Sequence, residues 1–390
     1  MKNNPRLRIG LVFDDSLDSN DGVSQYVKGL GAWLSDQGHQ VSYLVGQTEL
    51  GAWHNGTVYS LAKNITIRFN GNKLSMPIYA NKKAIKKVLI EGKFDILHVM
   101  APYSPFMAQR VINLASSGTV VVGTFHIYPA GWLSSYGSGV LKLLLGPSLK
   151  KFSAFVSVSS AAAGFAKSAY GIKSSIVPNP VDIGRLANTS AKIQRKSDRH
   201  IVFLGRLVKR KGASELIEAF ALLSKTMSDC RLSIAGGGPQ KHRLMSQVKK
   251  FGLESKVEFL GYIKEEDKPQ LLHSADIACL PSLYGESFGI VLVEAMAAGS
   301  GVVLGGDNPG YRSVLEEQPL LLVDPRNTPV FAARLAHLLN DKATAKQLYD
   351  WQQRSVKQYD INVVGVQILD LYNRQIASLT KKSNNIAHEQ

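Results

Sequence analysis

The sequence predicts an α/β protein in which two doubly wound domains face each other across a cleft. Three observations predict this fold. The chain has 390 residues, more than one ordinary hydrophobic core organises. Short segments that are apolar throughout alternate with segments of helical periodicity, which indicates parallel sheets covered by helices on both faces. The alternation occurs twice, on either side of a segment rich in proline, small polar and charged residues.

The first series begins with an apolar strand at 8–13 and a loop that ends at Gly22. A helix follows, because apolar residues recur at helical spacing from Val23 to Leu34. Further buried strands are expected within 40–46, 94–100, 119–126 and 152–159.

The second series begins with an apolar strand at 200–206. Strands of the same kind are expected within 231–238, 256–262, 276–282, 301–306 and 320–325. Helices near 331–339 and over 363–379 close the chain. Since open parallel sheets bind ligands beyond the carboxyl ends of their strands, two facing sheets predict a working site in the cleft between them.

The domain boundaries are predicted from the segment 177–199, which has prolines and charges but no apolar periodicity. We expect one domain over 1–182 and a second over 183–362. A C-terminal helix over 363–380 is expected to pack back on the first domain, and 381–390 to be a disordered tail.

Charge is the strongest compositional signal. The chain has 46 Lys and Arg against 30 Asp and Glu, a net of +16. Residues 50–181 contain 14 Lys and Arg but only two acids, Glu91 and Asp95. A field of one sign over a third of the chain points to an anionic partner, either nucleic acid or an anionic membrane surface. Generic solubility is the competing explanation, but it does not require acids to be missing from one region.

The cysteines and the N-terminus predict a cytoplasmic protein. Cys230 and Cys279 have no metal-ligand spacing, and two thiols do not make a disulfide framework. The apolar run 9–13 is too short for a signal peptide, and no stretch approaches the roughly 18 apolar residues of a spanning helix.

The segment 285–299, "GESFGIVLVEAMAAG", places two glutamates around an apolar run. It predicts a loop that contains Glu286 and a helix, from 288 to a stop at Gly299, that contains Glu294. Eight residues at helical rise span roughly 12 Å, about the length of a nucleotide sugar. The helix N-terminus between the carboxylates suits a diphosphate. One carboxylate would then hold hydroxyls of the transferred sugar and the other those of the ribose.

This E-x7-E pattern resembles the signature of the retaining glycosyltransferases of family four, which have the two-domain architecture called GT-B. The resemblance covers nearly the whole chain and includes "DGVSQYV" (21–27), "GTFH" (123–126) and "FLGRLVKRKG" (203–212). Within the family the chain is similar to the bacterial phosphatidylinositol mannosyltransferases. The resemblance implies that the first domain binds acceptor and membrane, and that the second binds a nucleotide-sugar donor.

The resemblance also implies roles for individual residues. Arg206 and Lys211 match a basic pair that grips the donor diphosphate, where preorganised cations stabilise the leaving group. His126 matches a histidine beside the transferred sugar, although a lone histidine at a strand end is more often structural. With Glu286, these residues form the expected catalytic set. The expected donor-binding set is Gly22, Ile263, Ser287, Phe288, Gly289, Ile290 and Glu294. No D-x-D motif is visible, so no metal is required for the diphosphate contact. No prosthetic group is expected either.

The acceptor side departs from the phosphatidylinositol mannosyltransferases. Asp15 stands in place of an aromatic residue, Asp21 replaces a glycine, and Phe69 precedes Asn70 where the relatives have tyrosine. Asp15 and Asn70 are the expected acceptor-binding residues. Because carboxylates near an anionic phosphoinositide are unfavourable, Asp15 is expected to bind hydroxyls of another lipid or of a glycolipid.

A helix within 79–93 is the candidate membrane contact. Its lysines form two i,i+4 pairs, and a solvated helix face is the ordinary explanation. The matching helix of the phosphatidylinositol mannosyltransferases touches anionic membrane, so Lys82, Lys83, Lys86 and Lys87 are the expected membrane-binding residues. The segment 131–152 is a second candidate interface, with core packing as the alternative.

The sequence thus predicts a retaining glycosyltransferase that moves a hexose from a nucleotide sugar to a lipid or glycolipid, on the inner face of the cell membrane. GDP-mannose is the first expectation for the donor and UDP-glucose the second. The alternative is a glucosyl- or galactosyltransferase that uses a UDP-sugar and a diacylglycerol-type or soluble acceptor. A nucleotide-sugar epimerase would not explain the E-x7-E motif. A nucleic-acid-binding protein would explain the charge, but the basic third lacks the interleaved aromatics of a recognisable module.

Overall fold

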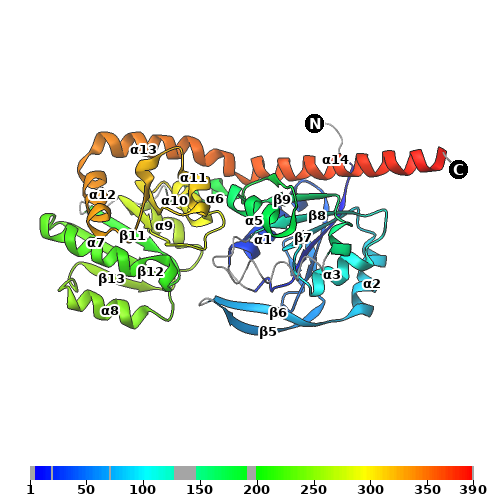
Figure 1. Ribbon diagram of the computed structural model, residues 1–390, viewed down its shortest axis with the longest axis horizontal. Helices are drawn as coiled ribbons and strands as arrows, with labels where there is room; N and C mark the ends of the chain where they lie inside the picture. The colour runs from blue at the N-terminus through cyan, green and yellow to red at the C-terminus, as the bar shows by residue number, and fades with distance from the viewer. Residues whose placement is uncertain (1–4, 19–20, 70–71, 127–145, 191–198, 389–390) are drawn as a thin grey trace. The chain divides into compact units, whose positions relative to one another are not determined.

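The computed structural model, shown in Figure 1, describes residues 5–18, 21–69, 72–126, 146–190 and 199–388. The chain forms two compact units. Unit 1 comprises residues 1–180 and 361–390, and unit 2 comprises residues 181–360. These limits lie within two residues of the domain limits expected from the sequence.

Unit 1 contains a sheet of eight strands in the order β10-β9-β8-β7-β1-β2-β4-β3. Its neighbours pair in parallel except β3 and β4, which are antiparallel. The strands are β1 Arg8–Phe13, β2 Gln40–Val45, β3 Ala52–Trp53, β4 Gly56–Ser60, β7 Ile96–Met100, β8 Val120–Phe125, β9 Ala154–Ser157 and β10 Ser175–Ile176. The predicted strands of the first series are therefore confirmed.

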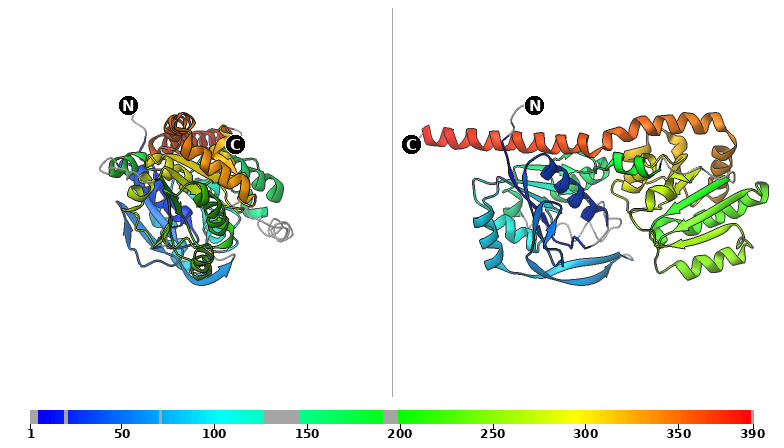
Figure 2. Two further views of the ribbon diagram at one scale, coloured as in Figure 1. Left: turned by 90° about the vertical axis from the view of Figure 1, so that its left-hand side faces the viewer. Right: turned by 180° about the vertical axis from the view of Figure 1, so that it is seen from behind.

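Helices cover both faces of this sheet. In the described residues of unit 1 the helices are α1 Gly22–Asp36, α2 Lys82–Gly92, α3 Met107–Leu114, α5 Ser160–Tyr170 and α14 Ile361–His388. One buried cluster joins the sheet to α1 and α14 through side chains such as Leu30 and Ile368. A second cluster joins the other face to α2 and α3 through Ile85 and Val111. Figure 2 shows α14 as the long red helix of this unit.

Unit 2 contains a parallel sheet of six strands in the order β13-β12-β11-β14-β15-β16. Its strands are β11 Arg199–Leu204, β12 Cys230–Ala235, β13 Val257–Gly261, β14 Ile277–Leu280, β15 Val302–Gly306 and β16 Leu322–Val323. Its helices are α6 Ile183–Ser190, η1 Lys209–Lys211, α7 Ala213–Thr226, α8 Lys241–Lys250, α9 Lys268–His273, α10 Ile290–Ala297, α11 Pro309–Leu315, η2 Pro319–Leu321, α12 Thr328–Asn340, α13 Lys342–Ser355 and η3 Val356–Tyr359. Each unit is thus a Rossmann-like α/β layer structure, as predicted.

Three local predictions were wrong or incomplete. Part of the expected linker is the helix α6, in which Leu186 is buried. The expected disordered tail continues α14 to His388, because lengthening a helix that is already anchored costs far less than nucleating one. A separate antiparallel pair, β5 Ala62–Phe69 and β6 Asn72–Ala80, was not predicted at all.

Candidate functional site

The strand order of unit 2 identifies where a ligand should bind. The chain runs outward from β11 to β12 and β13 on one side, and then returns to β14 on the other side of β11. A crevice forms at such a switch point, beyond the carboxyl ends of the two central strands. The loop after β11 carries Arg206 and Lys211, and the loop after β14 carries Glu286.

The two loops are held together by backbone contacts. Gly212 has a φ of 73°, and a Cβ atom there would overlap the carbonyl oxygen of Pro281. The backbone N–H of Leu283 donates to the carbonyl of Arg210 at 2.7 Å. These close approaches require glycine at position 212 and fix the side chains that follow on both loops.

Glu286 is the centre of the cation cluster formed by these loops. Its Oε1 lies 2.7 Å from Nη1 of Arg210 and 2.7 Å from Nζ of Lys211. Its side chain is 12% exposed. Burial by itself raises the pKa of a carboxyl group, but the charges of Lys211 and Arg210 outweigh this effect and hold the pKa of Glu286 below its ordinary value. Glu286 is therefore ionised at neutral pH.

Arg206 adds a third cation to the cluster. It follows β11 with an exposed side chain. Partial burial and the nearby charge of Arg210 lower the pKa of Arg206. Three cations against the single carboxylate of Glu286 leave a net positive charge at the switch point. Such a site favours an anionic group such as a diphosphate.

Glu294 occupies a different environment. It is buried on α10, and both of its oxygens accept from Nζ of Lys268, at 3.1 and 3.2 Å. Lys268 also contacts Glu265 at 2.7 Å. Burial raises the pKa of Glu294 even though Lys268 opposes this effect. The two predicted carboxylates thus belong to two separate ion-pair clusters.

The N-terminus of α10 lies between these clusters in the chain. The helix begins at Ile290, two residues later than predicted, because Gly289 precedes it with a φ of 104°. A Cβ at Gly289 would lie 2.6 Å from the ring of Tyr311. As the N-cap residue, Gly289 provides no side-chain hydrogen bond to the helix. Among the other predicted donor residues, Phe288 is buried against Tyr359, and Ser287, Ile290 and Ile263 are partly exposed.

His126 follows β8 in unit 1 and is buried. Its Nε2 lies 3.2 Å from Sδ of Met100, and its ring meets the ring of Tyr26 edge-on with 4.6 Å between centroids. Burial lowers the pKa of His126 to about 3. The imidazole is therefore neutral, which suits a hydrogen-bonding or packing role and excludes a cationic one.

The loop after β1 is acidic. Asp21 precedes Gly22 and caps α1, accepting from the backbone N–H groups of Val23 and Ser24 at 2.9 and 3.0 Å. The side chain of Asp15 accepts from the backbone N–H of Ser16 at 2.7 Å. The N-terminus of α1 therefore already faces a carboxylate, which disfavours an anionic ligand there.

The adjacent Asp14 continues this acidic loop. Its carboxylate accepts from the hydroxyl of Ser104 and from the backbone N–H of Ala108, the latter at 2.7 Å. Burial raises the pKa of Asp14 to about 6. The expected acceptor residue Asn70 lies outside the described residues, as do positions 131–145 of the second candidate membrane interface.

The predicted membrane lysines lie on α2. All four are exposed: Lys82, Lys83, Lys86 and Lys87. Ile85 and Val88 face the core, and Ile90 lies on the opposite face with 61% exposure. Because Ile90 follows three of the lysines by three, four and seven residues, it shares their face of the helix.

Sequence reasoning missed two residues of the site. Arg210 was assigned no role, although its side chain contacts Glu286 as that of Lys211 does. Lys268 was not considered, because 26 residues separate it from Glu294. A run of adjacent cations beside a buried acid could have suggested Arg210, whereas the Lys268 contact depends on how α9 packs against α10.

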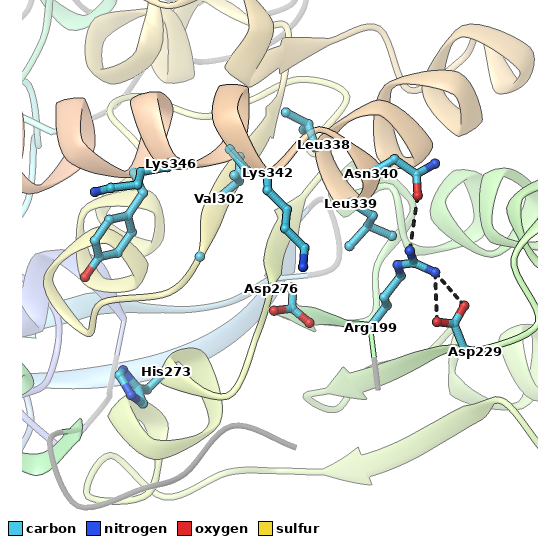
Figure 3. Close-up of a pocket in the computed structure, with 13 residues that line it drawn as sticks. Arg199, Asp229, His273, Asp276, Val302, Leu338, Leu339, Asn340, Lys342 and Lys346 are labelled. Atoms are coloured by element: carbon cyan, nitrogen blue, oxygen red, sulfur yellow. Dashed lines mark hydrogen bonds and ion pairs between the residues drawn. The ribbon is translucent and has the colours of Figure 1, made fainter. Parts of the chain in front are cut away.

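A cavity of about 700 Å³ lies elsewhere in unit 2 (Figure 3). It opens at the amino-terminal ends of β11, β14 and β15, opposite the edge that carries Glu286. Figure 3 shows Arg199 bonded to Asp229 and Asn340. Since parallel α/β sheets bind ligands at the carboxyl edge and the arginine is already paired, this cavity is not the donor site.

Two properties of the described part of the chain bear on membrane and metal. None of its helices combines the length and apolar character that a bilayer span requires. Its His, Cys, Asp and Glu side chains form no group of three or more that could hold a metal ion.

Comparison with known proteins identifies the family. Residues 20–185 match the model described as Glycosyltransferase Family 4, and residues 187–355 match Glycosyl transferases group 1. The phosphatidyl-myo-inositol mannosyltransferase of Mycolicibacterium smegmatis is 32% identical over 370 residues, covering 94% of this chain and 93% of the relative. The chain belongs to the family-4 glycosyltransferases. The protein of the same name from Mycobacterium leprae is 30% identical over 379 residues, covering 96% and 99%.

Solved structures place this glycosyltransferase in the GT-B fold. A glycosyltransferase from Rickettsia africae ESF-5 has a TM-score of 0.74 at 16% identity and covers 94% of this chain and 98% of its own. Anabaena HepE, solved in complex with UDP, has a TM-score of 0.71 at 16% identity and covers 94% and 99%. The two parallel sheets are the Rossmann-like sheets of this fold.

Proposed function

We propose that this glycosyltransferase moves mannose from GDP-mannose to a membrane lipid or glycolipid, with retention of configuration. One observation carries the donor assignment: Glu286 and the cations of the β11 loop meet at the switch point of the unit 2 sheet. The choice of mannose is supported by relatives named as mannosyltransferases at 30% and 32% identity over most of the chain.

In this proposal each end of the donor has its own contacts. Arg206 and Lys211 bind the diphosphate together with the N-terminus of α10, and Glu286 accepts hydrogen bonds from hydroxyls of the transferred sugar. Glu294 binds the ribose hydroxyls while Lys268 keeps it paired. Ile263, Ser287, Phe288, Gly289 and Ile290 complete the donor contacts, whereas the carboxylate of Asp21 disfavours the expected approach of the diphosphate to Gly22.

The chemistry requires little acid–base catalysis by the protein. The acceptor hydroxyl attacks an oxocarbenium-like carbon from the face that the leaving diphosphate vacates, and a phosphate oxygen takes the acceptor proton. Arg206, Lys211 and the helix terminus stabilise the charge that develops on the diphosphate. The neutral His126 contacts the transferred sugar through a hydrogen bond, and we assign it no proton transfer.

The acceptor proposal follows from charge. Asp14, Asp15 and Asp21 gather after β1 and before α1, so a phosphate group would be repelled there. We propose that Asp15 and Asn70 bind uncharged hydroxyls of a glycolipid or a diacylglycerol-type lipid. The enzyme acts as a peripheral protein at the inner face of the cell membrane, where the lysines of α2 contact anionic headgroups.

A thermal-shift panel tests the donor assignment. GDP and GDP-mannose should raise the melting temperature, because a ligand at 100 times its Kd stabilises the folded state by about 2.7 kcal/mol. Stabilisation by UDP and UDP-glucose instead would favour the UDP-sugar alternative. If none of the four stabilised the protein, the donor site would be assigned wrongly. The anomeric configuration of the product, read by NMR, tests retention.

Membrane contact through α2 has its own test. Replacing Lys82, Lys83, Lys86 and Lys87 with serine should weaken binding to anionic vesicles by on the order of 1,000-fold at low salt, since each lysine contributes about 1 kcal/mol. Vesicle flotation measures the effect.

The control for this test removes cations from an exposed helix of unit 2. A variant with serine at Arg243, Lys249 and Lys250 of α8 should bind vesicles nearly as well as the wild type. Equal losses in both variants would show that net charge, and not the α2 surface, drives membrane binding.

A further inference from the structure

We infer that Arg210 is a positioning residue that holds the Glu286 carboxylate while Lys211 engages the diphosphate of the donor. The inference rests on the proposed function and adds to it a residue that has no role in the predictions from the sequence. It starts from one geometric fact: both cations contact the same oxygen, Oε1 of Glu286, at 2.7 Å.

The two cations differ in how firmly they are tied to Glu286. The carbonyl of Arg210 accepts from the backbone N–H of Leu283, so Arg210 is fixed to the loop that carries Glu286. Lys211 has a compact ammonium group on a flexible stem of four carbons, whereas the guanidinium of Arg210 presents several donors in a planar fork. Lys211 is therefore the cation that can turn away, and Arg210 is the one that stays.

Charge explains why a second cation is needed. In the structure Lys211 and Arg210 both neutralise Glu286, whose side chain is only 12% exposed. When Lys211 turns to the diphosphate, a Glu286 without Arg210 would be a buried, unpaired carboxylate beside further negative charge. That arrangement is strongly unfavourable, and it favours a protonated carboxyl that binds sugar hydroxyls less well.

The test compares Arg210→Gln with Lys209→Gln, which changes the neighbouring exposed lysine of η1. Arg210→Gln should lower kcat by about 10- to 100-fold, the range expected for a charged hydrogen bond, with the affinity for the nucleoside diphosphate changed by less than about 3-fold. The low-pH limb of kcat should move to higher pH, because losing Arg210 raises the pKa of Glu286 in the donor complex. Lys209→Gln should match the wild type, and Arg210→Lys should recover part of kcat.

A double-mutant cycle separates this role from a general structural one. In a Glu286→Gln background, Arg210→Gln should lower kcat further by less than about 3-fold, because Arg210 acts through the carboxylate. An equal loss in both backgrounds, or an unmoved pH limb, would overturn the inference. If Arg210→Gln does not fold, Arg210→Lys gives the same comparison. A wild-type protein that transfers no sugar from either donor would overturn the proposed function and this inference together, whereas an active wild type with an unaffected Arg210→Gln overturns the inference alone.

Discussion

Replacing Glu286 with glutamine should slow sugar transfer by at least about 100-fold while nucleoside diphosphate binding stays measurable. The substitution keeps the size of the side chain but removes the negative charge that Arg210 and Lys211 share at 2.7 Å. The sugar then loses a charged hydrogen-bond acceptor. Arg210 and Lys211 are also left facing a neutral amide, which no longer orders the hydroxyls of the donor sugar. Initial rates with the donor from the thermal-shift panel measure the loss.

The control for Glu286→Gln is Glu258→Gln, which removes a carboxylate from an exposed position on β13 of the same unit. It should leave kcat and the donor affinity within about 2-fold of the wild type, as is usual for surface positions. Calorimetry with the nucleoside diphosphate shows whether the donor site of Glu286→Gln is intact. Unchanged turnover in that variant would refute the sugar-binding role of Glu286.

The environments of the two glutamates also separate their roles. The paired cations keep the pKa of Glu286 below its ordinary value, whereas burial raises the pKa of Glu294 against the opposing charge of Lys268. Glu286 therefore remains a charged acceptor over a wide pH range. Glu294 is held by contacts within unit 2, to Lys268 and through it to Glu265, which suits a group that positions one end of a ligand.

Much of the fold could be predicted because its signals are local. Strands such as Val120–Phe125 are mostly apolar and are buried at every position, so the parallel sheets can be inferred from short windows of sequence. The hairpin of β5 and β6 was missed because part of its sequence is polar and its pairing is separate from the large sheet. The helix α6 was missed because the prolines and charges around it resemble a linker.

The position of the candidate site could be predicted from the sequence, but the ion pairs that its side chains form could not. Motif and spacing located Glu286, Lys211 and the start of α10, which the structure brings to the carboxyl edge of one sheet. The sequence could not show that the carboxylates are already paired, because those partners are set by the packing of loops and helices 26 and 76 residues apart. Arg210 and Lys268 are therefore findings of the structure.

Helix α14 should prove essential to the stability of unit 1, and Gly365 is the position that tests this most directly. A Cβ there would lie 2.6 Å from carbons of the Trp33 ring on α1, whose Nε1 donates to Asn362 at 3.0 Å. Gly365→Ala should destabilise unit 1 by about 1–3 kcal/mol through overpacking, although alanine is the better helix former. The matched control is Gly164→Ala in α5, where a Cβ meets nothing within 4 Å, and which should be stabilising by about 0.5–1 kcal/mol. Hydrogen exchange reports on local opening in a chain of two units. Exchange rates of the α1 and α14 amides measure how Gly365→Ala and Gly164→Ala change the stability of unit 1. Slower exchange in Gly365→Ala than in the wild type would contradict the packing argument, because the added methyl group would then have found space beside Trp33.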